Sequence, residues 1–164
     1  TDHIDLLINC AGILGDMNKN LGDDLDFDEI MRVINVNAIG TLRVTNALSL
    51  LVLNSTEKTI VNISSEAGSI ADCERTGWFG YCMSKAANNM QSALVHNNIR
   101  KLGGKVFAIH PGHVATYMRG HLDTTAKITP DVSAEGILYV VLDTPHPINS
   151  RPLYLDYTGK ELPW

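Results

Sequence analysis

Short apolar runs alternate with longer amphipathic segments along most of this chain. Each run has the length of a strand, is rich in β-branched residues and ends in small or polar residues, as buried strands do. The runs are Ile4–Asn9, Thr59–Ser64, Val106–Ile109 and Leu153–Asp156. Because strands that alternate with helices form parallel sheets, the pattern predicts an α/β fold with a doubly wound parallel sheet. Right-handed crossovers would bring the carboxyl ends of these strands to one edge.

Helices and loops are expected between the runs. The expected helices are Phe27–Leu53, Gly80–Leu102, which ends at Gly103-Gly104, and Thr129–Asp143, which Thr129 would cap. The expected loops are Ile13–Asp26, Ser65–Trp78 and Pro111–Ile128, the last with short helices. Acidic residues from Asp23 to Glu29 would lie at the start of the first helix, where carboxylates suit the helix dipole. Metal binding by this acidic cluster is the alternative.

Composition narrows the possible classes of protein. A chain of 164 residues suits one domain, so residues 1–164 are expected to form a single unit. A net charge of −5 argues against nucleic acid as a partner. No uninterrupted apolar run approaches the length of about 18 residues that a membrane span needs. The 3 cysteines lack metal-site spacing, which favours reduced thiols and a cytoplasmic location.

Tyr81 and Lys85 are the strongest candidates for chemistry. Residues four apart on a helix lie on one face, so the phenol and the ammonium would be neighbours. A cation about 4 Å away interacts with a phenolate by about 4 kcal/mol at an effective dielectric near 20, which would lower the phenol's pKa of about 10. The pair could therefore donate and accept a proton. An ordinary helical tyrosine and lysine that share no site is the alternative.

Polar or small residues also follow three of the predicted strands. In open α/β sheets, ligands bind at the carboxyl ends of the strands. The motifs at these ends are Asn9-Cys10-Ala11-Gly12, Ser64-Ser65 and the Pro-Gly loop that begins at Pro111. Each could be only a turn, but together with Tyr81 and Lys85 they predict a site at this edge.

These motifs together resemble the short-chain dehydrogenase/reductase family, with its Rossmann-like fold, over essentially the whole chain. The matching positions, in the family's order, are Asn9-Cys10-Ala11-Gly12, Asn37, Ser65, Tyr81 with Lys85, and Pro111 to Thr116. The residues from Tyr154 to Trp164 further resemble the sniffer-like or C-factor-like carbonyl reductases. Cys10 stands where the family has a second asparagine.

The resemblance implies an oxidoreductase that transfers a hydride between NAD(P)(H) and a carbonyl or alcohol substrate. Tyr81 would be the general acid/base, and Lys85 would lower its pKa and bind the nicotinamide ribose. Ser65 would donate a hydrogen bond to the substrate oxygen, where charge develops. Asn37 would hold a water of a proton relay. His110 and His113 flank the Pro-Gly pair without a third ligand at metal spacing, so no metal site is expected.

The resemblance also implies which residues bind the cofactor, NADP or NAD, with NADP favoured by the subgroup. Residues near the adenosine side would be Asn9, Cys10, Ala11 and Gly12. Those near the nicotinamide would be Tyr81, Lys85, Pro111, Gly112, Val114 and Thr116. Family members commonly pair through the helices that match Phe27–Leu53 and Gly80–Leu102, so a homodimer or homotetramer is expected.

One family feature has no match in this sequence. The opening strand and its Thr-Gly-x-x-x-Gly-x-Gly turn, which hold the cofactor pyrophosphate, are not found. The chain therefore resembles the carboxyl-terminal two-thirds of such an enzyme. Ile4–Asn9 would be an open sheet edge, so we expect poor solubility or pairing of this edge with a second chain. The alternative function is a non-catalytic remnant that acts as a partner-binding or regulatory chain.

Overall fold

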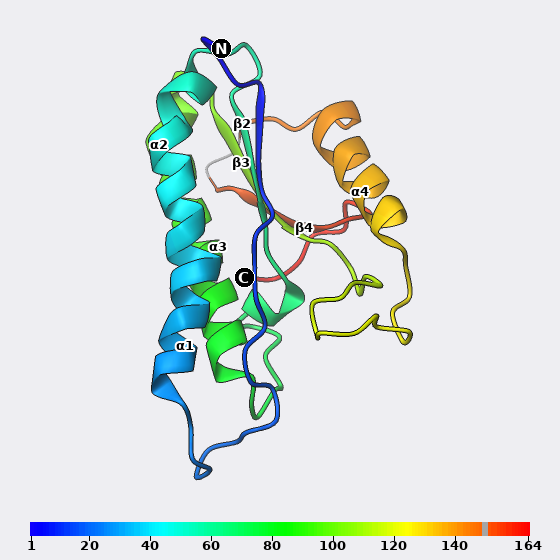
Figure 1. Cartoon of the computed structure of the whole chain (residues 1–164). Helices are drawn as coiled ribbons and strands as arrows, with labels where there is room; N and C mark the ends of the chain where they lie inside the picture. The colour runs from blue at the N-terminus through cyan, green and yellow to red at the C-terminus, as the bar shows by residue number, and fades with distance from the viewer. Residues whose placement is uncertain (149–150) are drawn as a thin grey trace.

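A four-stranded parallel sheet forms the centre of the computed structural model, which describes residues 1–148 and 151–164 (Figure 1). The strands lie in the order β1 (Leu6–Asn9), β2 (Thr59–Ile63), β3 (Lys105–His110) and β4 (Leu153–Asp156). The predicted strands and their parallel arrangement are confirmed. The first strand begins later than expected because the Ile4 N–H donates to the Leu51 carbonyl, 3.0 Å away on a helix, and not to a strand.

The helices agree with the prediction in extent but not in internal geometry. Phe27–Leu53 is one continuous rod, made of α1 (Phe27–Ile34), the π-helical η1 (Asn35–Gly40) and α2 (Thr41–Leu53). The later helical segments are η2 (Glu66–Gly68), α3 (Phe79–Ile99), η3 (Arg100–Leu102), α4 (Pro130–Leu138) and the π-helical η4 (Tyr139–Asp143). The Asp26 and Thr129 side chains cap α1 and α4, so the acidic cluster begins a helix as expected.

The short helices expected within Pro111–Ile128 are not present in this fully described segment. The segment is held by tertiary bonds and not by a helical ladder. Val114 and Ile128 form an isolated parallel bridge, and the Asp123 N–H donates to the Thr116 carbonyl at 3.0 Å. That part of the sequence prediction was wrong because such long-range bonds leave no periodic pattern.

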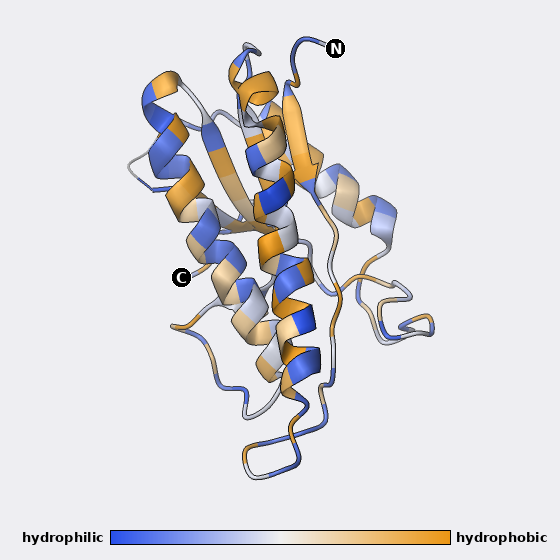
Figure 2. Cartoon of the chain, turned by 60° about the vertical axis from the view of Figure 1, so that its left-hand side comes forward, coloured by the Kyte–Doolittle hydropathy of each residue, from blue (hydrophilic) through white to orange (hydrophobic). Residues whose placement is uncertain are grey.

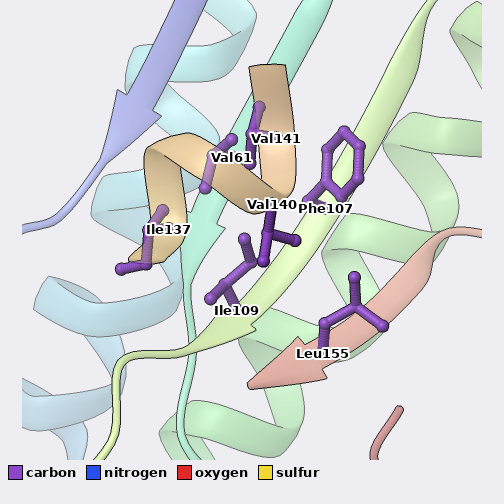
Figure 3. Close-up of a cluster of buried hydrophobic side chains, with 7 residues drawn as sticks. All are labelled: Val61, Phe107, Ile109, Ile137, Val140, Val141 and Leu155. Carbon is purple, nitrogen blue, oxygen red and sulfur yellow. The ribbon is translucent and has the colours of Figure 1, made fainter. Parts of the chain in front are cut away.

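Two hydrophobic clusters cover the two faces of the sheet. On one face α2 and α3 pack through the cluster Leu7, Val52, Ile60, Ile99 and Val106. On the other face α4 and η4 pack through the cluster Val61, Phe107, Ile109, Ile137, Val140, Val141 and Leu155 (Figure 3). Neighbouring residues of β2 and β3 belong to opposite clusters because side chains alternate along a strand. The central strands are therefore buried on both sides, as expected of a parallel sheet.

The crossovers do not all share one hand. The chain moves in the same direction along the sheet from β2 to β3 and from β3 to β4. Between β2 and β3 it passes through α3 on one face, whereas between β3 and β4 it passes through α4 on the other (Figure 1). These two crossovers therefore have opposite hands, and the expectation of right-handed crossovers throughout was wrong. All the strands still point the same way, so their carboxyl ends share one edge.

The outer surfaces of the long helices carry both apolar and polar residues (Figure 2). Exposed apolar side chains on these surfaces include Leu42, Val44, Leu50, Met83, Met90 and Leu94. By length and composition alone the Phe27–Leu53 helix could cross a membrane, although the sequence has no uninterrupted apolar run of that length. Core helices of soluble proteins meet the same criteria, and here the helix packs against the sheet through Val52.

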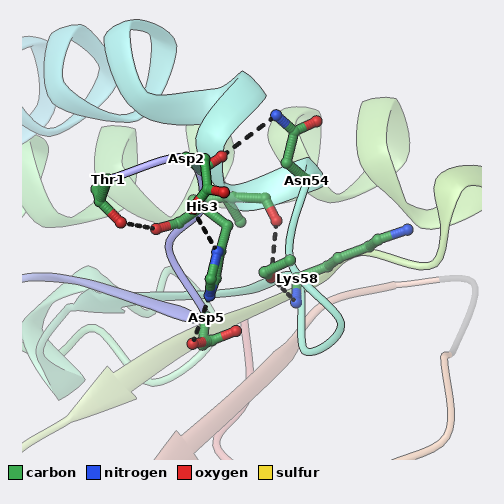
Figure 4. A network of polar contacts seen from close by, with 8 residues as sticks. Thr1, Asp2, His3, Asp5, Asn54 and Lys58 are labelled. Atoms are coloured by element: carbon green, nitrogen blue, oxygen red, sulfur yellow. Dashed lines mark hydrogen bonds and ion pairs between the residues drawn. The ribbon is translucent and has the colours of Figure 1, made fainter.

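Polar contacts fix the segment that leads into β1 (Figure 4). The Thr1 hydroxyl donates to the His3 carbonyl at 3.0 Å, and His3 lies within 3.6 Å of Asp5. The Asn54 amide, at the end of α2, donates to the Asp2 carbonyl at 3.4 Å. The first two contacts lie within the segment, and the bond from Asn54 attaches it to α2.

Candidate active site

The parallel strands bring the predicted site residues to the carboxyl edge of the sheet. Gly12 follows β1, Asn37 lies in η1, and Lys85 lies in α3. A side-chain carbon at Gly12 would lie 3.4 Å from Asn37 Oδ1 and 3.7 Å from Lys85 Nζ. Segments far apart in the sequence therefore meet at one place, as the motif pattern predicted.

The Asn37 side chain connects the turn after β1 with α3. Asn37 is 1% exposed, and its Oδ1 accepts from the Ile13 N–H at 2.8 Å. Its Nδ2 donates to the Ile13 carbonyl at 2.8 Å and to Ser84 Oγ at 2.9 Å. The π-helical geometry of η1 surrounds this residue, and such segments are frequent at functional sites. The amide is thus committed to protein groups, and its role in a water relay stays a prediction.

Ser65 lies between β2 and η2 and is almost buried. Its hydroxyl caps η2 by accepting from the Ala67 N–H at 3.2 Å. Its carbonyl accepts a hydrogen bond from the Tyr154 hydroxyl, which comes from β4. The last strand therefore helps to fix the serine, a contact that sequence reasoning missed because the two residues lie far apart in the chain.

Tyr81 and Lys85 lie on one face of α3, as their spacing predicted. Lys85 Nζ lies 5.6 Å from the centroid of the Tyr81 ring and donates to the Ile63 carbonyl at 2.9 Å. Both side chains are buried. Burial lowers the pKa of Lys85 from 10.5 to about 8, because removal from water disfavours the charged form.

The predicted lowering of the Tyr81 pKa by Lys85 stays a prediction, because the effect of burial dominates this pKa. Burial raises the pKa of Tyr81 above 10.0, since the phenolate is poorly solvated there. The nearby Ser65 hydroxyl and the Arg75 charge act in the opposite direction and lower that pKa. Lys85 donates to the Ile63 carbonyl, and burial disfavours its charge, so two cations, Lys85 and Arg75, act near this phenol.

Lys85→Met should stabilise the fold at neutral pH. The unfolded chain binds the lysine proton more tightly than the folded chain, so this group's burial costs stability below about pH 8. The cost falls as pH rises through the interval from about 8 to 10.5. We expect the variant's free energy of unfolding to exceed the parent's at pH 7 by up to about 3 kcal/mol, and the difference to shrink by pH 10. Urea unfolding at both pH values measures it.

The exposed Lys101→Met is the matched control and should show no such pH-dependent difference. A Lys85→Met protein that is no more stable than the parent at pH 7, or that gains its advantage only at alkaline pH, would contradict the assignment.

The residues expected near the cofactor take two different positions. Asn9 is buried, and its amide donates to Thr45 Oγ1 at 3.0 Å and to Asn62 Oδ1 at 2.8 Å. Its side chain thus supports the sheet and α2, while Cys10 and Ala11 are exposed at the edge. Gly12 leaves open the space beside Lys85 that a side chain would occupy.

The other expected cofactor residues, Pro111, Gly112, Val114 and Thr116, lie in the loop after β3. Gly112 has a φ of 85°, which favours glycine, and a side-chain carbon there would come within 2.7 Å of Ile128. The loop reaches the end of β1, since Met118 Cε lies 3.7 Å from the position of a side-chain carbon at Gly12. The motifs after β1 and β3 therefore face one space.

Asp123 organises this loop and was not singled out in the sequence. Its carboxylate accepts from the Thr125 N–H at 3.0 Å and from the Thr125 hydroxyl at 2.6 Å. Its Oδ2 lies 2.9 Å from His113 Nε2. The hydrogen bonds from Thr125 and His113 hold the pKa of Asp123 below its usual range. An irregular segment has no sequence pattern from which the role of this aspartate could be predicted.

No group of three or more His, Cys, Asp and Glu side chains within residues 1–148 and 151–164 is placed to hold a metal ion.

The fold and the edge motifs together define a short-chain dehydrogenase. The family model "short chain dehydrogenase" matches residues 1–127, and the chain belongs to this family.

Three relatives place the chain within the family. It is 37% identical over 164 residues to C-signal from Myxococcus xanthus, and the match covers 95% of that protein. A carbonyl reductase from chicken fatty liver, solved with NADPH, superposes with a TM-score of 0.86 at 30% identity. The chain covers 67% of that structure. The carbonyl reductase Sniffer of D. melanogaster also superposes with a TM-score of 0.86, and at 21% identity it supports the fold alone. The expected family and its sniffer-like neighbours are confirmed.

Proposed function

We propose that this chain carries the catalytic part of a carbonyl reductase that uses NADP in preference to NAD. The observation that carries the proposal is the meeting of Tyr81 and Lys85 with Asn37 beside the open space at Gly12. The absence of a side chain at Gly12 keeps the position beside Lys85 and Asn37 free for a ligand atom. A carbonyl reductase solved with NADPH, 30% identical to this chain, supports the choice of cofactor.

The residues would divide the reaction among them. Tyr81 would transfer its phenolic proton to the carbonyl oxygen, and it would take the proton back in the reverse direction. Ser65 would donate a hydrogen bond to that oxygen as negative charge develops on it. Lys85 and the Thr116 loop would orient the nicotinamide, which supplies the hydride when it is bound. Proton transfer by a positioned side chain contributes about 10²- to 10⁴-fold to such a rate.

The family setting supports further proposals about the whole protein. We infer that residues 1–164 belong to one domain. The substrate would be a small carbonyl or alcohol compound, the location cytoplasmic, and the assembly a homodimer or homotetramer. The exposed apolar residues of α2 and α3 support the assembly, because family members commonly pair through these helices.

A second function is favoured by one comparison. The match covers 95% of C-signal, so that protein, whose name denotes a signal, has nearly the same extent as this chain. A partner-binding or signalling chain that kept the fold but not the turnover would explain the shared extent. The polar residues of the site favour catalysis, since a decayed enzyme has no reason to keep them.

A turnover assay separates the two functions. We expect the polypeptide isolated from its own source to oxidise NADPH when ketones, aldehydes or quinones are added, with NADH less effective. The measurement is the loss of reduced-nicotinamide absorbance, together with the intact mass of the isolated protein. Failure of both cofactors to bind, in a protein whose mass is near 17.9 kDa, would favour the partner-binding function.

A further inference from the structure

The segment between η2 and α3 contains a side chain that joins the two ends of the candidate site. Arg75 Nη2 lies 2.8 Å from Glu66 Oε1, and its guanidinium carbon lies 5.4 Å from the centroid of the Trp78 ring. Glu66 directly follows Ser65, and Trp78 directly precedes the helix that carries Tyr81. Arg75 therefore links the serine end of the site to the tyrosine end.

Trp78 has an unusual backbone conformation at this position. Its φ of 63° and ψ of 33° lie in the left-handed region, which costs conformational energy for a bulky residue. Its ring meets the Tyr81 ring edge-on, with the centroids 6.3 Å apart and the planes at 70°. The contacts of the Trp78 ring with Tyr81 and Arg75 can offset that cost. Strain of this kind is commonly found where a side chain must be held in place for function.

We propose that Arg75 is a positioning residue for Tyr81: paired with Glu66, it holds Trp78 against the Tyr81 ring and keeps a positive charge beside the phenol. This rests on the proposed function only insofar as Tyr81 is the proton donor. The signs of the charges near Tyr81 agree with this proposal. The charge of Arg75 lowers the pKa of Tyr81, whereas the charge of Glu66 and, at alkaline pH, that of the Cys82 thiolate raise it. Lys85 is the other cation that faces the Tyr81 ring.

A surface ion pair without consequence is the competing explanation, since exposed pairs often contribute little. The Arg75 side chain is 29% exposed and that of Glu66 is 58% exposed. The two explanations differ in what happens at Trp78 and Tyr81. A mere surface pair would leave both aromatic rings unchanged when it is removed.

Fluorescence tests the positioning without any need for turnover. The chain has 2 tryptophans, so Trp164→Phe leaves Trp78 as the reporter. In that background Arg75→Gln should raise the acrylamide quenching constant of Trp78 about twofold or more, because the ring loses the guanidinium that covers it. Arg75→Lys should give an intermediate value, since it keeps the charge but not the planar group. Arg32→Gln, which removes the arginine of another surface pair with Glu29, is the matched control and should change nothing.

The pH profile of reduction tests the charge. Arg75→Gln should move the pKa that Tyr81 contributes to kcat/KM upward by about half a unit or more, and Glu66→Gln should move it downward. If Arg75 and Glu66 had a purely structural role, both substitutions would move the pH profile in the same direction. Quenching constants and profiles that match those of Arg32→Gln would overturn the proposal. If the protein has no reductase activity, the proposed function fails, while the fluorescence result still decides whether Arg75 holds Trp78. Should Arg75→Gln not fold, Glu66→Gln provides the same quenching test.

Discussion

Tyr81→Phe should reduce kcat/KM for carbonyl reduction by at least about 10²-fold and up to about 10⁴-fold, the range attributed to a positioned proton donor. The phenol is buried and lies within hydrogen-bonding reach of Ser65, so it is placed to supply the proton to a substrate oxygen held there. Removal of one hydroxyl leaves the ring and its contact with Trp78 in place. The fold and the affinity for NADPH should therefore change little, and the loss should fall on kcat.

Steady-state kinetics with NADPH titrations measures this split. Tyr139→Phe is the matched control, because Tyr139 lies in η4 and is 64% exposed. Its kinetics should equal those of the parent. Turnover that survives Tyr81→Phe within about threefold would remove Tyr81 as the proton donor and, with it, the mechanism proposed for this site.

The fold could be predicted because each strand is a short, strongly apolar run that can be recognised from its own stretch of sequence. The apolar runs of β2 and β3 alternate with helical segments, and this alternation implied the parallel sheet. The spacing of Tyr81 and Lys85 predicted a shared helix face for the same local reason. The residues that meet at Gly12 could be expected because parallel strands end at a common edge.

Features that depend on tertiary contacts could not be predicted in this way. The hand of the crossover through α4 depends on which sheet face that helix covers, and both faces of β3 are apolar and buried. The bonds of Asn37, in the π-helical η1, reach Ile13 and Ser84, which are distant in the chain. The burial of Lys85 and its bond to the Ile63 carbonyl could not be predicted, because helical spacing fixes neither burial nor the direction of an ammonium group.

Asn37→Ala should be among the most destabilising single changes in the site. The buried amide is the hydrogen-bond partner of both the N–H and the carbonyl of Ile13, each at 2.8 Å. An alanine leaves these backbone groups unpaired in a partly buried place, and an unpaired buried polar group costs about 1–3 kcal/mol. We expect the free energy of unfolding to fall by roughly 2–4 kcal/mol. Ser84 Oγ would lose one donor but keep its own bond to the Tyr81 carbonyl, so α3 should stay intact.

Urea unfolding measures this change, and the variant Asn37→Asp separates its causes. An aspartate keeps an acceptor for the Ile13 N–H but cannot donate to the Ile13 carbonyl or to Ser84, and its charge is costly at a position that is 1% exposed. Its loss of stability should therefore be largest at neutral pH and smaller in acid, where the carboxyl group is protonated. Asn46→Ala, at an exposed position of α2, is the control and should change stability by no more than about 0.5 kcal/mol. An Asn37→Ala protein as stable as that control would show that the turn after β1 does not depend on this amide. The placement of Gly12 beside Lys85 would then need another cause.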